Sequence, residues 1–188
     1  MIYKCGEPIM EQVGCMPYPN LNTLGNAGMT AGDRKALRVA HVTHLNISNV
    51  RKVHDSLIEF TNENPTTNQS FISFEFHGTE KFASIPTNST AFGHRKPFYN
   101  VVIGQRWTNE QDDKIVDDWS KNIQEIINRD GDDSKSLYIN FESTVEDDAD
   151  YKGEKLKRCF GENLEKLKDL KRKYDPNVFF RKGIVIWP

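Results

Sequence analysis

Three stretches of the chain alternate apolar and polar residues as half-buried strands do. They cover residues 37–47, 71–77 and 101–107. In the second stretch, alternation directs three apolar side chains to the core and three polar ones to the opposite face. The apolar set is Ile72, Phe74 and Phe76, and the polar set is Ser73, Glu75 and His77. A short apolar run at residues 138–141 predicts a further strand near the C-terminus.

Two helices are predicted around these strands, because apolar residues recur there at steps of three and four. Ser48 would cap the first helix, and a Thr-x-x-Gln capping box from Thr108 to Gln111 would begin the second. Gly131 would cap the second helix at its C-terminal end. The first apolar face consists of Val50, Val53, Leu57 and Phe60, and the second of Ile115, Val116, Trp119, Ile123, Ile126 and Ile127.

A third amphipathic helix is predicted between residues 155 and 174. Its apolar face consists of Leu156, Phe160, Leu164, Leu167, Leu170 and Tyr174. The rest of its circumference is basic, with Lys155, Lys157, Arg158, Lys166, Lys168, Lys171 and Arg172. Asp175-Pro176 would end it, because the residue before a proline is disfavoured in the α region.

Elements in this order, with short connections, predict an α+β fold in which helices pack on one face of an antiparallel sheet. Residues 1–36 contain Pro8, Pro17 and Pro19 and show little periodicity, so they are predicted to form an irregular linker. Residues 37–135 would then be the main domain. Residues 136–188 would add a C-terminal strand and helix.

The 188 residues suit one domain, or one domain with a segment of another. A formal net charge of -2 gives no general basic field for nucleic acid, although a local basic patch stays open. No apolar run is close to the length of about 18 residues that a membrane-spanning helix needs. The N-terminus lacks the apolar core of a signal peptide, which leaves the localisation open.

The three cysteines, Cys5, Cys15 and Cys159, show no Cys-x-x-Cys spacing, so neither a zinc site nor a disulfide framework is predicted. Free thiols are favoured over a bond between Cys5 and Cys15. The aspartates at residues 130–133 lack the spacing and the terminal glutamate of a calcium loop. No metal site is therefore predicted.

Several ordered motifs resemble those of one enzyme family. They are Thr90-Ala91-Phe92-Gly93-His94-Arg95, Tyr138-x-Asn140-Phe141, Phe160-Gly161-x-Asn163 and, after a leucine–lysine helix, Lys173-Tyr174-Asp175-Pro176. Together they resemble the C-terminal half of the berberine-bridge-enzyme-like FAD-linked oxidases, over residues 17–179. The resemblance implies a substrate-binding domain at residues 37–135. It also implies that residues 136–188 return to an FAD-binding domain and complete it.

The resemblance implies that an alcohol, sugar or alkaloid-type small molecule gives a hydride to FAD. Tyr138 would then act in catalysis, and Asn140 and Asn163 would contact the cofactor. Glu75 is the candidate acid or base on the sheet, with Ser73 as the second choice, since a carboxylate among aromatic residues is partly desolvated. The plain interpretation of Glu75 is a solvent-facing side chain on a half-buried sheet.

Departures from the family pattern keep a second interpretation open. Phe141 stands where the family commonly has a tyrosine, and Thr79 stands where a second glycine is expected. No glycine-rich phosphate-binding loop precedes Pro17, so a separate FAD-binding domain is the expected partner. The alternative is a non-catalytic binding module that keeps the fold without flavin. Likewise, His94 and Arg95 form either an anion site or a structural part of their loop.

Overall fold

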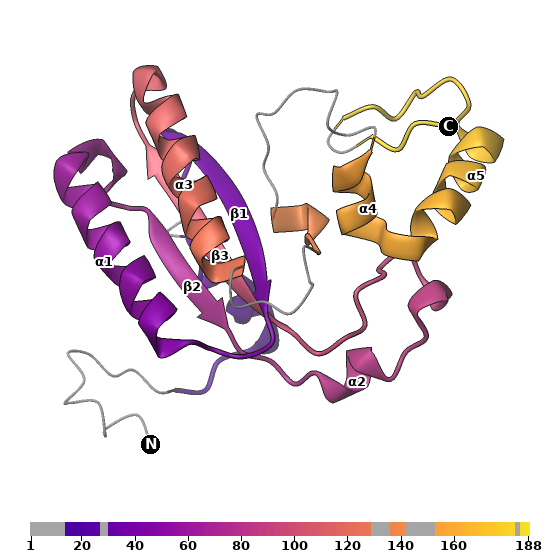
Figure 1. The fold of residues 1–188 in the computed structure, drawn as a ribbon, viewed down its shortest axis with the longest axis horizontal. Coiled ribbons are helices and arrows are strands. Elements are labelled where there is room, and N and C mark those ends of the chain that lie inside the picture. The colour runs from indigo at the N-terminus through magenta and orange to yellow at the C-terminus, as the bar shows by residue number, and fades with distance from the viewer. Residues whose placement is uncertain (1–13, 27–29, 129–135, 142–152, 183–184) are drawn as a thin grey trace. The chain divides into compact units, whose positions relative to one another are not determined.

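The computed structural model describes residues 14–26, 30–128, 136–141, 153–182 and 185–188 (Figure 1). The chain divides into two compact units, Met1–Gly32 and Asp33–Pro188. In the first unit, the 3-10 turn η2 (Tyr18–Thr23) follows Pro17, and Thr23 Oγ1 donates to the carbonyl of Asn20 at 2.7 Å. All described residues of this unit are exposed. Its assignment as a linker stays a prediction, and Cys5 and the cap at Gly131 lie outside the described residues.

The second unit is built on a three-stranded antiparallel sheet in the order β1-β3-β2. The strands are β1 (Arg34–Val42), β2 (Phe71–Glu75) and β3 (Tyr99–Trp107). The central Ile103 lies opposite Arg38 on one side and Ile72 on the other. The three predicted strands are confirmed, with shifted ends. Because β2 stops at Glu75, Phe76 lies beyond the sheet and is 61% exposed, so its predicted place in the core is wrong.

Two long helices, α1 (Ile47–Glu63) and α3 (Asp113–Asn128), cover one face of this sheet (Figure 1). Their buried side chains are Val53, Phe60, Val116, Trp119, Ile123 and Ile127, packed with Ala40, Val101 and Ile103 of the sheet. The rings of Phe60 and Trp119 stack with centroids 4.4 Å apart. The predicted α+β fold with helices on one face is confirmed.

The N-terminal cap of α1 differs from the prediction. Asn46 is the capping residue, and its Oδ1 accepts a hydrogen bond from the backbone N–H of Ser48 at 2.9 Å. Asparagine and serine are both good caps, so the pattern alone could not choose between neighbouring positions.

The start of α3 also differs, because a 3-10 turn, η6 (Glu110–Asp112), replaces the predicted capping box. The carboxylate of Asp113 accepts from Trp107 Nε1 at 2.7 Å and from Arg34 Nη2 at 2.6 Å. These two bonds to the sheet fix the first residue of α3. Ile115, predicted to face the core, is exposed.

Shorter elements lie in the connections on either side of β2. They are η4 (Pro65–Thr67), α2 (Glu80–Ala83) and η5 (Thr87–Ser89). In the C-terminal segment, the predicted strand at residues 138–141 is instead a 3-10 turn, η7 (Ile139–Phe141). The N–H of Phe141 donates to the carbonyl of Tyr138 at 3.0 Å. This turn satisfies the backbone locally, where a strand would need a neighbour to pair with.

The single predicted C-terminal helix is divided into α4 (Glu154–Phe160), η9 (Gly161–Asn163) and α5 (Leu164–Tyr174). Gly161 has a φ of +55°, which ends α4 and redirects the chain. The predicted apolar face therefore does not continue from α4 into α5. Tyr174 is 71% exposed and Lys155 is buried, contrary to the predicted faces. The predicted stop is confirmed, because α5 ends immediately before Asp175-Pro176.

None of the helices in the described ranges is long and apolar enough to cross a bilayer.

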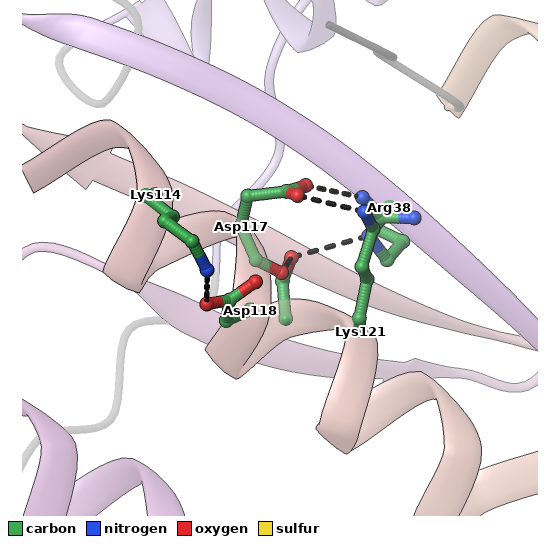
Figure 2. A network of polar contacts seen from close by, with 6 residues as sticks. Arg38, Lys114, Asp117, Asp118 and Lys121 are labelled. Atoms are coloured by element: carbon green, nitrogen blue, oxygen red, sulfur yellow. Dashed lines mark hydrogen bonds and ion pairs between the residues drawn. The ribbon is translucent and has the colours of Figure 1, made fainter. Parts of the chain in front are cut away.

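A polar contact through Arg38 also joins the sheet to α3. Arg38 is buried on the helix-covered face (Figure 2). Arg38 Nη2 donates to Asp117 Oδ1 at 2.7 Å, and Arg38 Nε donates to Ser120 Oγ at 3.1 Å. Lys121 pairs with the other oxygen of Asp117 at 2.9 Å.

Replacing Asp117 by Ala should lower the free energy of unfolding by about 2–3 kcal/mol, because a buried guanidinium loses a carboxylate partner. The matched control is Asp118→Ala, which breaks the exposed pair with Lys114 on the same helix (Figure 2). That change should cost about 0.5 kcal/mol or less. Denaturant titration measures both values, and equal losses in the two variants would contradict the importance of the buried contact.

Candidate active site

A row of polar residues crosses the sheet on the face that α1 and α3 leave uncovered. His41 and Glu75 are both directly opposite Asn100, one on each side of the central strand. Opposed residues project to the same face, and Ile72 and Phe74 take the alternate, helix-covered face. Glu75 therefore lies on the face that the alternation predicted. Its position in the row brings it close to residues from two other strands.

A cavity of about 710 Å³ lies between this row and the C-terminal segment. Its polar wall groups belong to Glu75, His77, Asn100 and Tyr138. Its rings are those of Phe82, Phe92, Phe98, Phe141 and Phe160. Residues from the strand at 71–75, the loop at 90–95 and the segments at 137–141 and 159–160 thus line one space, although the chain separates them widely.

Glu75 is half-buried in the wall of this cavity, and Asn100 holds one of its oxygens. Asn100 Nδ2 donates to Glu75 Oε2 at 3.2 Å. No other hydrogen bond reaches this carboxylate from the residues that the structure describes. The second oxygen, Oε1, therefore accepts no hydrogen bond from these residues. Ser73, the second choice, lies on the same sheet face but is not part of the cavity wall.

Tyr138 and Asn140 lie next to each other, and a 3-10 turn rather than the predicted strand brings them together. Asn140 Nδ2 donates to the phenol oxygen of Tyr138 at 2.9 Å. Tyr138 lines the cavity and is half-buried, whereas Asn140 is exposed. The ring of Phe141 meets that of Tyr138 edge-on at 5.2 Å. Phenylalanine at this position keeps the aromatic wall and lacks the hydroxyl.

Asn163 joins the C-terminal segment to the loop at residues 87–93. It is buried, and its Nδ2 donates to the carbonyl of Thr87 at 2.8 Å and to that of Thr90 at 3.1 Å. A Cβ atom at Gly93 would lie 2.7 Å from the carbonyl oxygen of Phe160, so only glycine permits this approach. Asn163 does not line the cavity, and its role as a cofactor contact stays a prediction.

Arg95 has a structural function in the same loop. Its Nη2 donates to Thr90 Oγ1 at 2.7 Å, and its guanidinium lies 5.0 Å above the ring of Phe92. Through Phe92 it supports the aromatic wall of the cavity. The neighbouring His94 is half-buried, and burial lowers its pKa despite opposing hydrogen bonds to backbone groups of the C-terminal segment.

His41 is the least expected residue near the site. It is fully buried, its Nδ1 is hydrogen-bonded to Ser136 Oγ at 2.7 Å, and its ring stacks on Phe98 at 4.2 Å. Burial, reinforced by the charges of His94 and His77, lowers the pKa of His41 to about 4. His41 is therefore neutral at pH 7, and it ties the sheet to the start of the C-terminal segment.

Sequence reasoning did not single out Asn100, His41 or Phe98. Asn100 was missed because the third strand is predicted to begin at Val101, two residues after the start of β3 at Tyr99. His41 is a polar residue between apolar neighbours in the first strand. This alternation indicates that it projects to the face that the helices leave uncovered. Only the pairing register, which the sequence does not contain, shows that it lies beside Asn100.

Known proteins are similar to this chain in sequence and in fold. Residues 137–183 match the family described as berberine and berberine-like. The FAD-linked oxidoreductase aurO of Gibberella zeae is 30% identical over 144 residues, which cover 71% of this chain and 26% of that protein. The FAD-linked oxidoreductase iacH of Pestalotiopsis fici is 29% identical over 87% of this chain and 32% of its own length.

Solved structures show the same fold at lower identity. Berberine bridge enzyme from Eschscholzia californica superposes with a TM-score of 0.59 at 19% identity, over 83% of this chain and 33% of that one. A chitooligosaccharide oxidase gives 0.60 at 17% identity, also over 83% and 33%. The chain thus spans about a third or less of these relatives. Residues 137–183 belong to the berberine and berberine-like family, and the chain is similar in sequence to part of FAD-linked oxidoreductases and in fold to part of berberine bridge enzyme.

Proposed function

We propose that this chain supplies the substrate-binding sheet and the C-terminal segment of an FAD-dependent oxidoreductase acting on a small alcohol with an apolar ring. The observation that carries the proposal is the environment of Glu75. Its half-buried carboxylate is held at one oxygen by Asn100, and the other oxygen is available in a cavity walled mainly by aromatic rings. The names of the sequence relatives support an oxidoreductase that uses FAD.

The cavity wall favours an apolar ring over a sugar as the substrate. Phe82, Phe92, Phe98 and Phe160 offer ring faces and edges, which bind flat apolar groups well. A sugar would need a hydrogen-bonding partner for nearly every hydroxyl. The polar groups are few, and an alcohol with one hydroxyl directed at Glu75 satisfies them better than a polyol does.

Tyr138 and Asn140 are the groups best suited to hold the isoalloxazine of FAD. The exposed amide of Asn140 can both donate and accept, which suits the carbonyls and the ring N–H of a flavin. The phenol of Tyr138 lies between Asn140 and the cavity. When bound, FAD supplies the acceptor for the hydride that leaves the substrate carbon.

The residues of this chain would handle the proton and the orientation of the substrate. Glu75 accepts the hydroxyl proton at Oε1, while Asn100 keeps the carboxylate in place through Oε2. Phe92, supported by Arg95, holds the ring of the substrate. Asn163 acts indirectly, because its two bonds to the loop at residues 87–93 keep that wall against the C-terminal segment.

A chimera tests the proposal. This chain replaces the corresponding C-terminal region of the Gibberella zeae relative, which supplies the rest of an FAD-linked enzyme. We expect the purified chimera to be yellow and to be bleached under anaerobic conditions by benzylic alcohols faster than by glucose. Faster bleaching by glucose would overturn the substrate class. A folded, yellow chimera that no alcohol bleaches would favour the non-catalytic module.

A further inference from the structure

A second cavity, of about 660 Å³, lies beside the first and shares Phe98 with it. One wall is the loop at residues 93–98, and another is the corner where α4 ends and η9 begins. Neither Glu75 nor Tyr138 lines this space. The proposed oxidation therefore does not account for it.

The charge of this second cavity is strongly one-sided. Among the described residues, four cationic side chains line it, namely Arg95, Lys96, Lys157 and Arg158, against one carboxylate, that of Glu162. Lys96 is exposed and forms no hydrogen bond or ion pair with any described residue. Lys157 has Glu154 as its ion-pair partner, at 3.8 Å on the exposed surface of α4, where such a pair contributes little. The charges of Lys96 and Lys157 are thus little neutralised by the described residues.

This concentration of positive charge is local, since the whole chain has a formal net charge of -2. A cleft lined by one sign of charge focuses the electrostatic potential and attracts a counter-ion of opposite sign. Arg95 is already fixed by Thr90 and by the ring of Phe92, so little side-chain entropy remains to be lost there. The hydroxyls of Thr87 and Ser136 provide further polar contacts in the wall.

From these residues we propose that the second cavity is a binding site for a small phosphate-bearing anion. A doubly charged phosphate matches the surplus of cations better than a single carboxylate does, and lysine and arginine are its usual partners. The volume suits a small molecule. Cations from the loop and from α4 would grip the anion from two sides, which would also stabilise the contact between the loop and the C-terminal segment.

Calorimetric titration of the full chain with inorganic pyrophosphate at about 50 mM salt tests the site. We expect saturable binding at one site per chain that weakens clearly at about 200 mM salt. Lys96→Gln and Lys157→Gln, one in each wall, should each raise the dissociation constant about tenfold. Lys166→Gln removes an equal charge from the exposed surface of α5 and should leave the dissociation constant unchanged.

The absence of binding, or equal weakening by Lys166→Gln, would overturn the proposal. Citrate is the comparison ligand, and citrate binding as tightly as pyrophosphate would overturn the assignment to phosphate. Circular dichroism checks that each variant is folded, because exposed lysine changes should leave the fold intact. Competition identifies the source of the phosphate. FAD displacing pyrophosphate where riboflavin does not would point to a dinucleotide, and no displacement by either would point to a separate phosphorylated ligand.

Discussion

Replacing Glu75 by Gln in the flavin-loaded chimera should slow bleaching by a benzylic alcohol by about 10²–10⁴-fold. Glutamine has nearly the same shape as glutamate and can still accept a hydrogen bond from Asn100 Nδ2, which now contacts Glu75 Oε2 at 3.2 Å. It cannot take a proton from the substrate hydroxyl. The substrate should therefore still bind, and the loss should lie in the rate at saturating substrate rather than in KM.

Glu80→Gln is the control for this experiment. Glu80 is exposed at the start of α2, close in sequence to Glu75 and outside the cavity wall. The same charge is removed there, and the bleaching rate should not change. If Glu75→Gln bleached at the normal rate, the carboxylate would have no part in proton transfer, and Tyr138 would be the group to test next.

The predicted fold follows from features that local sequence contains. Strands and helices have different periods, and those at residues 71–75 and 113–128 are strongly periodic. The predictions for the C-terminal segment were wrong at the two places where periodicity is weak evidence. Leucines spaced for one helix gave no sign that Gly161 would adopt a positive φ, and a four-residue apolar run cannot show whether a pairing strand is available.

The candidate site was accessible from sequence only in part. Glu75, Tyr138 and Asn140 were named from alternation and from family motifs, and the structure places Glu75 and Tyr138 in one cavity wall. Asn100 and His41 depend on the register of three strands, a long-range property that composition and spacing do not encode. The cationic cavity likewise requires residues 93–98 and α4 to meet in space.

Acidification should destabilise this protein through His41. Its pKa is about 4 in the folded chain, against 6.5 as the ordinary value of an exposed histidine. Above pH about 6.5 neither state binds the proton, so His41 has no effect. As the pH falls below 6.5, His41 binds a proton in the unfolded chain but stays neutral in the folded chain until the pH approaches 4. The free energy of unfolding should therefore fall by about 2 kcal/mol at pH 5 and by about 3 kcal/mol below pH 4.

The variant His41→Gln separates this contribution from that of titrating carboxylates. It removes the titration while keeping a polar group that can reach Ser136, so the variant should be less stable at pH 7 but lose less stability between pH 7 and pH 5. His54→Gln, at an exposed position, should keep the full slope. Some slope should persist in His41→Gln, because burial lowers the pKa of His94 in the same direction. Denaturant titrations at several pH values measure these slopes, and an unchanged slope in His41→Gln would refute the assignment.

The consequence for the cavity follows from the hydrogen bond between His41 and Ser136. Ser136 immediately precedes Leu137 and Tyr138, which line the cavity. Protonation of the buried His41 favours its exposure to water, and that exposure would separate this wall from the sheet. The backbone of Leu137 is also tied to α4, because its N–H donates to the carbonyl of Arg158 at 3.0 Å. Acid should therefore loosen the C-terminal segment as one piece. Amide exchange at Leu137 should accelerate between pH 7 and pH 5, beyond its intrinsic pH dependence, in the wild-type chain more than in His41→Gln.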